Sequence, residues 1–122
     1  MKNKELGALG EELARRHLKR AGYKIIAANY RSPQGEIDLI ARKKDCLVFV
    51  EVKCRRGDGF GPPEEAVTSA KRQKLVRVAE HYLQHEAANA ADWRIDVVAI
   101  ELDDHNRTTR LEIIENAVIQ DG

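Results

Sequence analysis

Three side chains on two neighbouring predicted strands have the types and spacing to do chemistry: Asp38 in "EIDLIA", and Glu51 and Lys53 in "CLVFVEVKC". Side chains alternate along a strand, so Glu51 and Lys53 project from the same face, about 6.6 Å apart at the backbone. If the hairpin pairs around "RKKD", residues whose numbers sum to about 87 to 89 face each other. Asp38 then lies opposite residues 49–51, and the two carboxylates come within cross-strand distance.

Two opposed carboxylates repel each other, so we expect a positive charge between them. Lys53 could supply that charge in a solvent-facing salt bridge, which is worth roughly 0–1 kcal/mol. The alternative is a hard divalent cation. Two carboxylates, a backbone carbonyl and waters suit Mg²⁺, and Lys53 beside the metal would orient or polarise an attacking water. Spacing alone leaves both interpretations open.

A fourth candidate, Glu11, lies in a predicted helix with a stripe of leucines and alanines. At about 100° per residue, Glu11 points roughly 20° from Leu18, at the border of the buried face. There it could lean over the sheet edge toward the carboxylate pair, or it could form an ion pair with Arg15, four residues further on. Helix geometry does not choose between the two.

Hydrophobic periodicity and turn residues divide the chain into two helices and five strands. Apolar residues at helical spacing predict a helix over residues 4–21 that Gly22 ends, and Thr68 or Ser69 is the expected N-cap of a second long helix. Strands are predicted at residues 23–30, 36–41, 46–54, 93–101 and 109–119, and an irregular loop at residues 55–63. A helix between the third and fourth strands permits a parallel crossover. We therefore predict an α/β (α+β) fold in which two helices flank a mixed central sheet, with residues 1–122 as a single domain.

The composition is that of a soluble globular domain. Of the 122 residues, 43% are hydrophobic and 34% are charged, and no apolar run approaches the roughly 20 residues that span a bilayer. The start of the chain carries charges instead of the apolar core of a signal peptide. Cys46 and Cys54 lack a metal-binding or nucleophile pattern, as expected of reduced thiols. We therefore expect a cytoplasmic protein.

Charge is distributed unevenly along the chain. Residues 1–60 hold 14 Lys and Arg against 8 Asp and Glu, a net charge of +6, whereas the remainder holds 7 against 12, a net charge of −5. This asymmetry suggests a basic face that meets a polyanion. A solvated surface without a partner produces a moderate imbalance about as often, so both interpretations remain open.

Four segments in this order, "GALGEELARRHL", "GEIDLIA", "VFVEVKCR" and "RIDVVAI", resemble the YraN-like family of uncharacterised bacterial proteins. That family belongs to the PD-(D/E)XK nuclease superfamily and is similar to archaeal Holliday-junction resolvases. The resemblance covers nearly the whole chain. The ordered set of Glu11, Asp38 and Glu51-x-Lys53 is far more specific than a lone Glu-x-Lys, although Ile37 stands where the superfamily name has Pro.

The resemblance implies a restriction-endonuclease-like core of order αβββαβ and a catalytic set of four residues. Asp38 and Glu51 would bind Mg²⁺ or Mn²⁺, Lys53 would orient the attacking water, and Glu11 would assist from outside the metal's ligands. The implied function is that of a metal-dependent endonuclease that binds and hydrolyses DNA phosphodiesters, branched DNA included.

The expected partner is double-stranded or branched DNA and not a membrane, and the resemblance is compatible with a homodimer. Aromatic residues make up only 5% of the chain, which disfavours a base-stacking platform for single strands. Phosphate contacts are expected from cations of the loop and the second helix, for which a solvated helix face is the alternative. These cations are Arg55, Arg56, Lys71, Arg72 and Lys74.

Two other functions remain open on the sequence. One is a nucleic-acid-binding protein that keeps the nuclease fold without cutting. The other is an interaction module whose acidic second half docks a basic partner. Strong DNA binding with a steep salt dependence would count against the interaction module.

Other polar residues are expected to be structural. His81 and His85 have a spacing that can bind a metal, but no Glu stands between them in HExxH order and no third ligand is near. We expect them to be surface or partly packed histidines. Asp96 lies between Ile95 and Val97 in a strand, where we expect a structural salt bridge.

Overall fold

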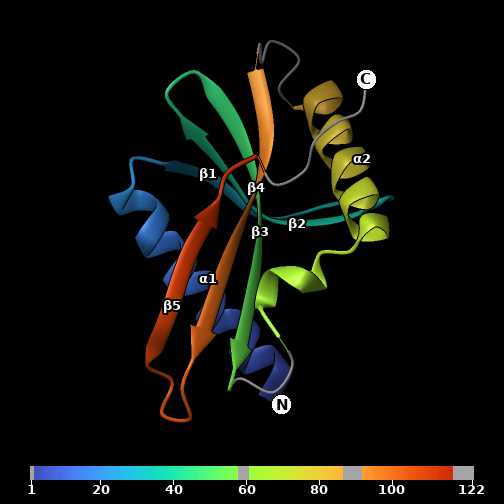
Figure 1. The fold of residues 1–122 in the computed structure, drawn as a ribbon. Helices are drawn as coiled ribbons and strands as arrows, with labels where there is room; N and C mark the ends of the chain where they lie inside the picture. Colours follow the sequence, from blue (N-terminus) through green and yellow to red (C-terminus); the bar gives the residue numbers. More distant parts are fainter. Residues whose placement is uncertain (1, 58–60, 87–91, 117–122) are drawn as a thin grey trace.

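Two helices lie on opposite faces of a five-stranded sheet (Figure 1). The structure, a computed structural model, describes residues 2–57, 61–86 and 92–116. Neither described helix is long and apolar enough to cross a membrane. In chain order the elements are α1 (Lys2–Arg20), β1 (Lys24–Ser32), β2 (Gly35–Lys43), β3 (Cys46–Arg56), the 3-10 turn η1 (Pro63–Ala66), α2 (Ser69–His85), β4 (Asp92–Leu102) and β5 (Thr108–Ile114).

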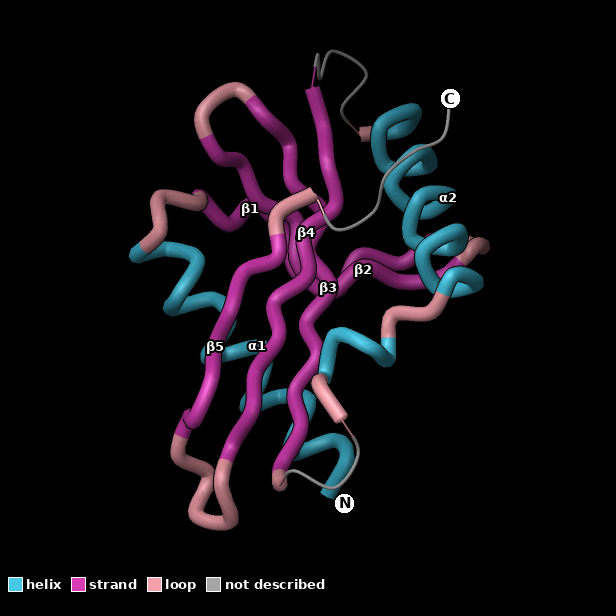
Figure 2. Tube along the Cα trace, viewed as in Figure 1, coloured by secondary structure: helices cyan, strands magenta, loops and turns pink. Residues whose placement is uncertain are grey.

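The sheet is mixed, as predicted, with the strand order β1-β2-β3-β4-β5. β1, β2 and β3 form an antiparallel meander, β3 and β4 run parallel, and β5 returns antiparallel to β4. The crossover through α2 makes the parallel pairing possible, because a parallel neighbour must start at the same end of the sheet. Figure 2 shows that β3, β4 and β5 run side by side, whereas β2 turns toward α2.

Four predicted strand ends are wrong by two residues or more. β1 and β2 end at Ser32 and Lys43 instead of residues 30 and 41. β3 continues two residues into the segment predicted as an irregular loop, because its parallel ladder with β4 extends as far as Arg56 and Leu102. β5 ends at Ile114, and residues 115 and 116 form a turn in place of the strand predicted over 109–119. Residues 117–119 of that prediction lie outside the described part of the chain.

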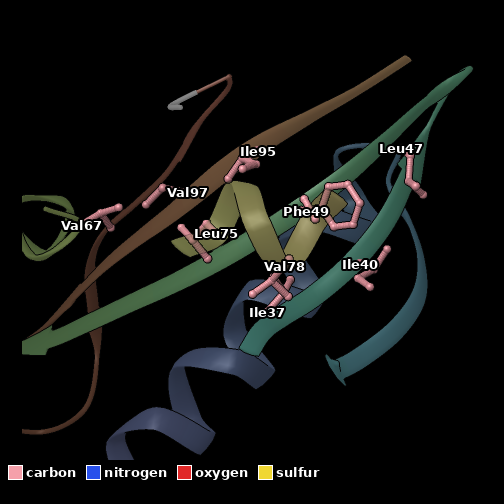
Figure 3. Close-up of a cluster of buried hydrophobic side chains, with 10 residues drawn as sticks. Ile37, Ile40, Leu47, Phe49, Val67, Leu75, Val78, Ile95 and Val97 are labelled. Atoms are coloured by element: carbon pink, nitrogen blue, oxygen red, sulfur yellow. The ribbon is translucent and has the colours of Figure 1, made fainter. Parts of the chain in front are cut away.

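The two faces of the sheet bury separate apolar clusters. Along β3, Leu47 and Phe49 pack on the α2 side and Val48 and Val50 on the α1 side, as strand alternation requires. Figure 3 shows Val78 of α2 beside side chains of β2 in the first of these clusters. The α2 cluster comprises the buried residues Ile37, Ile40, Leu47, Phe49, Val67, Leu75, Val78, Ala79, Ile95 and Val97, and the α1 cluster comprises Ala14, Leu18, Tyr23, Leu39, Ala41, Val48, Val50, Val98, Ile100 and Leu102.

The residues just before α2 pack against the α2 cluster. They include the 3-10 turn η1, and Thr68 rather than Ser69 caps α2. The Thr68 hydroxyl oxygen accepts a hydrogen bond from the N–H of Lys71 at 3.3 Å. Val67, between the two elements, is buried in the α2 cluster.

Asp96 is the centre of a buried polar network, and the predicted structural salt bridge is confirmed. The carboxylate accepts hydrogen bonds from the Tyr23 hydroxyl, from Arg94 Nε and from the N–H of Asn116, each at 2.9 Å. Burial, then the hydrogen bond and the charge of Asp96, hold the pKa of Tyr23 well above its usual value. This network ties the start of β1 to β4 and to the turn after β5.

His81 and His85 are partly packed or surface residues of α2, as expected. Their rings stack with centroids 4.1 Å apart. Nδ1 of His81 shares a hydrogen bond with the Tyr30 hydroxyl at 2.8 Å, and Nδ1 of His85 shares one with the carbonyl oxygen of His81 at 2.8 Å. The two histidines therefore support the packing between α2 and β1.

Gly10 lets α1 approach β3 closely. A Cβ placed at Gly10 would lie 2.7 Å from the Cβ of Cys54 and 3.3 Å from its Sγ, whereas carbon atoms in good contact are about 3.5–4.0 Å apart. A Cβ at Gly7, three residues earlier on the same helix, would meet nothing within 4 Å. The distance between α1 and the sheet therefore depends on the missing side chain of Gly10.

Gly10→Ala should destabilise the protein although alanine is the better helix former. The added methyl group pushes α1 away from Cys54, and overpacking of this kind costs about 1–3 kcal/mol. Gly7→Ala is the matched control and should stabilise the protein by about 0.5–1 kcal/mol, because only helix propensity changes there. Urea denaturation of both variants measures the difference. Equal free energies of unfolding would contradict the close packing of α1 on β3.

Candidate functional site

The candidate carboxylates meet where β2 leaves β3. The antiparallel ladder between these strands ends with Leu39 paired to Val50, so the next residues along it are Asp38 and Glu51. Beyond that point β2 continues alongside β1, and β3 continues alongside β4. The predicted register is confirmed. The β1–β2 pair and the β3–β4 pair therefore separate at this point. We call this point, where Asp38 and Glu51 lie, the fork.

The carboxylate of Asp38 bridges the fork. Its Oδ2 accepts a hydrogen bond from the backbone N–H of Val52 at 2.8 Å. Because β2 has diverged from β3, a side-chain oxygen takes the role that a backbone carbonyl has in a regular ladder. The hydrogen bond satisfies a half-buried donor and fixes the direction of the Asp38 carboxylate.

Glu51 and Lys53 project from the face of β3 that carries the α2 cluster, since they continue the alternation of Leu47 and Phe49. Lys53 Nζ lies 3.5 Å from Glu51 Oε2, and the side chains are 25% and 15% exposed, respectively. The pair therefore stands at the end of the core, largely screened from water but still reachable from solvent.

Lys53 stands beside two neighbouring acids at the fork. Burial, followed by a hydrogen bond and charge repulsion from Asp38, raises the pKa of Glu51 to about 8, although attraction to Lys53 opposes the rise. Glu51 therefore keeps a proton near neutral pH when Lys53 is the only cation beside it. The contact between Lys53 and Glu51 that spacing allowed is present, but one ammonium group does not keep both neighbouring acids in their charged form.

Glu11 contacts Asn29, the residue of β1 opposite Asp38. Glu11 Oε1 accepts a hydrogen bond from Asn29 Nδ2 at 3.3 Å, and no ion pair joins it to Arg15 within the described chain. Asn29 lies between two residues of β1 that pair with Leu39 and Ile37, so it stands across the ladder from Asp38. Of the two contacts expected for Glu11, the ion pair with Arg15 is not formed among the described residues, and the carboxylate instead contacts β1 through Asn29.

The five predicted phosphate contacts do not all lie together. The Arg55 guanidinium donates to the carbonyl oxygen of Gly61 at 3.2 Å, and Arg56 Nε donates to Asn106 Oδ1 at 2.8 Å in the β4–β5 hairpin. The other three residues lie in the first two turns of α2 with exposed side chains: Lys71, Arg72 and Lys74. Arg55 alternates with Lys53 and so shares the face of the fork, whereas Arg56 projects from the other face.

Residues that could hold a metal at the fork are Asp38 and Glu51. No group of three or more His, Cys, Asp and Glu side chains suited to a metal occurs in the described ranges. A cation at the fork would thus rely on two carboxylates, with water completing its shell, which is the arrangement that Mg²⁺ accepts most readily.

Sequence reasoning missed two contributors to the site, Asn29 and the N–H of Val52. Asparagine is depleted in strands, so its place in "IIAANY" is a signal that could have identified Asn29. No sequence signal identifies the N–H of Val52, because its hydrogen bond to Asp38 depends on where β2 and β3 separate.

Replacing Glu51 with glutamine should stabilise the protein at alkaline pH. The unfolded chain releases this proton near pH 4.5, whereas the folded protein keeps it until about pH 8. Between these values the folded state binds more protons, so wild-type stability falls as the pH rises. Glu51→Gln should match the wild type below this window and exceed it above the window by on the order of 1–3 kcal/mol. Chemical denaturation across this pH range tests the prediction, and a variant less stable than the wild type above pH 8 would contradict it.

Sequence comparisons extend over almost the whole chain. A "UPF0102 protein" of Caldicellulosiruptor saccharolyticus is 43% identical over 117 residues, which cover 96% of this chain and 99% of the relative. The corresponding protein of Rhodococcus opacus is 46% identical over 115 residues, with 94% and 97% covered. That of Chloroherpeton thalassium is 41% identical over 114 residues, with 93% and 88% covered.

The match to a protein family includes the fork. The family described as "Uncharacterised protein family UPF0102" matches residues 10–100, a range that contains Glu11, Asp38, Glu51 and Lys53. The YraN-like resemblance read from the motifs agrees with this match. The chain belongs to the UPF0102 family.

Proposed function

We propose that this protein is a metal-dependent endonuclease of the PD-(D/E)XK type, which hydrolyses phosphodiester bonds in double-stranded or branched DNA. The observation that carries the proposal is the fork, where Asp38 and Glu51 stand side by side and Lys53 Nζ lies 3.5 Å from Glu51. Hydrolysis by a metal-activated water needs carboxylates that bind the metal and a cation that stabilises the developing charge.

The order of the elements supports a restriction-endonuclease-like core. α1, the meander of β1 to β3, α2 and β4 follow one another as αβββαβ, and β4 joins the sheet parallel to β3. The fork lies in the middle strands of this unit. Fold alone does not determine activity, so the proposal depends on the side chains at the fork.

Asp38 and Glu51 would hold Mg²⁺ or Mn²⁺, and their chemistry fits such an ion. Mg²⁺ is commonly held by one or two carboxylates and keeps several of its waters. The repulsion that helps to raise the pKa of Glu51 is the charge imbalance that a divalent cation would remove. When bound, the metal would supply an activated water and polarise a phosphate oxygen.

The protein's own residues would orient the reactants. Asp38 is fixed by the N–H of Val52, so its carboxylate direction does not depend on a ligand. Lys53 is partly exposed on the same face as Glu51, where its ammonium group would hold the attacking water and stabilise charge on the phosphate oxygens. Glu11, bonded to Asn29, would assist from outside the metal's ligands.

Phosphate contacts outside the fork would come from exposed cations. Lys71, Arg72 and Lys74 are exposed at the start of α2, which covers the same face of the sheet as the fork. Contacts of this kind give affinity that depends on salt but not on base sequence. Arg55 and Arg56 would add contacts at the end of β3.

A nucleic-acid-binding protein that does not cut is the second candidate. It is favoured by the exposed cations at the start of α2, which would contact phosphates whether or not a metal is bound at the fork. Calorimetric titration with Mn²⁺ separates the two functions, because a pure binder has no need to take up the ion at Asp38 and Glu51.

Conservative changes at the fork should strongly reduce cleavage without unfolding the protein. Asp38→Asn, Glu51→Gln and Lys53→Met should each reduce Mg²⁺-dependent cleavage by about 10²–10³-fold, the loss expected for one group that stabilises the transition state. Asparagine keeps an acceptor for the Val52 N–H, whereas Asp38→Ala would leave that donor unsatisfied at a cost of about 1–3 kcal/mol. Cleavage of linear and branched DNA with Mg²⁺ or Mn²⁺ measures the effect.

The matched control for Asp38→Asn is Asp45→Asn, the same exchange at an exposed position in the β2–β3 turn. It should cleave DNA like the wild type. Undiminished cleavage by both Asp38→Asn and Glu51→Gln would show that the fork is not the catalytic centre.

Neutralising the α2 cations should weaken DNA binding and reduce its salt dependence. In Lys71→Gln/Lys74→Gln, the slope of log K against log salt should decrease by about 2, because each lost phosphate contact removes roughly 0.9. Lys19→Gln/Lys24→Gln removes two exposed lysines from the end of α1 and the start of β1 and should leave the slope unchanged. Equal slopes for both double variants would mean that α2 does not contact the DNA backbone.

A further inference from the structure

In both strands of the β1–β2 hairpin, the regular alternation of side chains between the two faces of the sheet is interrupted at the level of the fork. In a regular strand, residues two apart share a face. Here Ala28 packs against the α1 cluster and Tyr30 against the α2 cluster. On the paired strand, Leu39 belongs to the α1 cluster and Ile37 to the α2 cluster. The position between each of these pairs is Asn29 on β1 and Asp38 on β2.

The backbone of Asn29 accounts for the change of face on β1. Its φ is 53°, in the left-handed region that asparagine enters more readily than other residues with a side chain. One left-handed residue in a strand rotates the following side chains relative to the preceding ones. The hairpin is therefore bent at Asn29, directly across the ladder from Asp38, where β2 turns away from β3.

Besides its unusual backbone, Asn29 has a side-chain contact with α1. Its Nδ2 donates to Glu11 Oε1 at 3.3 Å, and the contact is exposed to solvent. An exposed hydrogen bond of this type contributes little to net stability. A left-handed residue whose side chain makes a solvent-exposed contact with a candidate catalytic residue is more readily explained by a role at the site than by stability.

We propose that Asn29 is a positioning residue of the fork, an inference that rests on the proposed nuclease function. Its backbone turns β2 so that Asp38 faces Glu51, and its amide holds the Glu11 carboxylate of α1 at the same level of the sheet. Asn29 itself need touch neither metal nor DNA.

Asn29→Gly separates the two roles, because glycine accepts the left-handed backbone but has no amide. With the fold kept, the variant should lose about 10- to 100-fold in kcat, as is typical when an outer residue that supports a metal site is removed. KM and the Mn²⁺ affinity should stay within about twofold, since Asp38 and Glu51 are retained. Glu11→Gln should show a similar loss, and Asn29→Gly/Glu11→Gln should be no worse than Glu11→Gln alone, because the two residues act as one unit.

Lys44→Gly is the control for the backbone change. Lys44 has φ of 55° in the β2–β3 turn, away from the fork, and its replacement should leave kcat at saturating DNA unchanged. An Asn29→Gly variant that cleaves like the wild type, or a double variant whose losses multiply, would overturn the inference while leaving the nuclease proposal intact.

A second measurement does not depend on cleavage. In ¹⁵N-labelled protein, Mn²⁺ should broaden the side-chain amide signal of Asn29, and Asp38→Asn should abolish the broadening. Glu11→Gln should shift the same signal. If the wild type does not cleave DNA but both spectral effects appear, the nuclease proposal fails and the placement of Asn29 at the fork stands. An amide signal that responds to neither change overturns the inference.

Discussion

The hydrogen bond from the N–H of Val52 to the carboxylate of Asp38 is the constraint on which the site depends. A strand in the middle of a sheet has donors on both edges, and β3 loses its β2 neighbour after Val50 while it stays paired with β4. An unpaired donor at that point would cost free energy. The Asp38 side chain satisfies it at 2.8 Å, so β2 can diverge and the carboxylate is fixed beside Glu51. The same contact thus allows the sheet to split and places a charge where it splits.

Two features of the fork lower the stability of the folded protein. Burial and Asp38 together raise the pKa of Glu51, and Asn29 holds a left-handed backbone in the adjoining strand. Each feature is unfavourable by itself and persists because the surrounding structure supports it. That support comes from the two apolar clusters, which hold β2 and β3 on either side, and from the close contact of Gly10 with Cys54. Features of this kind concentrate at functional sites, which is why the fork, rather than the fold, carries the proposed function.

The sequence was sufficient to predict the common face of Glu51 and Lys53 and the position of Asp38 opposite them. Strand alternation has a period of two and the short turn fixes the register, so these relations are local. It was not sufficient for the end of β3, where "RRG" reads as loop but pairing with β4 keeps Arg56 in the strand. Nor did it identify Asn29 as the partner of Glu11. Helical periodicity gives the direction of a side chain, but its neighbour depends on how closely α1 packs on the sheet, and that distance is set by Gly10 and Cys54.

The two parts of the chain differ in net charge, and the candidate site lies in the positive part. The fork is assembled from α1, β1, β2 and β3, all within the first 56 residues, and residues 1–60 carry a net charge of +6. The remainder has a net charge of −5 and pairs several of its acidic groups internally: Glu64, Glu101 and Glu112 each bind Arg110 within 3 Å, and Asp96 binds Arg94. The excess positive charge therefore lies in the part of the sequence that carries the fork. Lys71, Arg72 and Lys74 add exposed positive charge at the start of α2, on the same face of the sheet as Glu51. A field of this sign near the fork would attract a phosphate backbone.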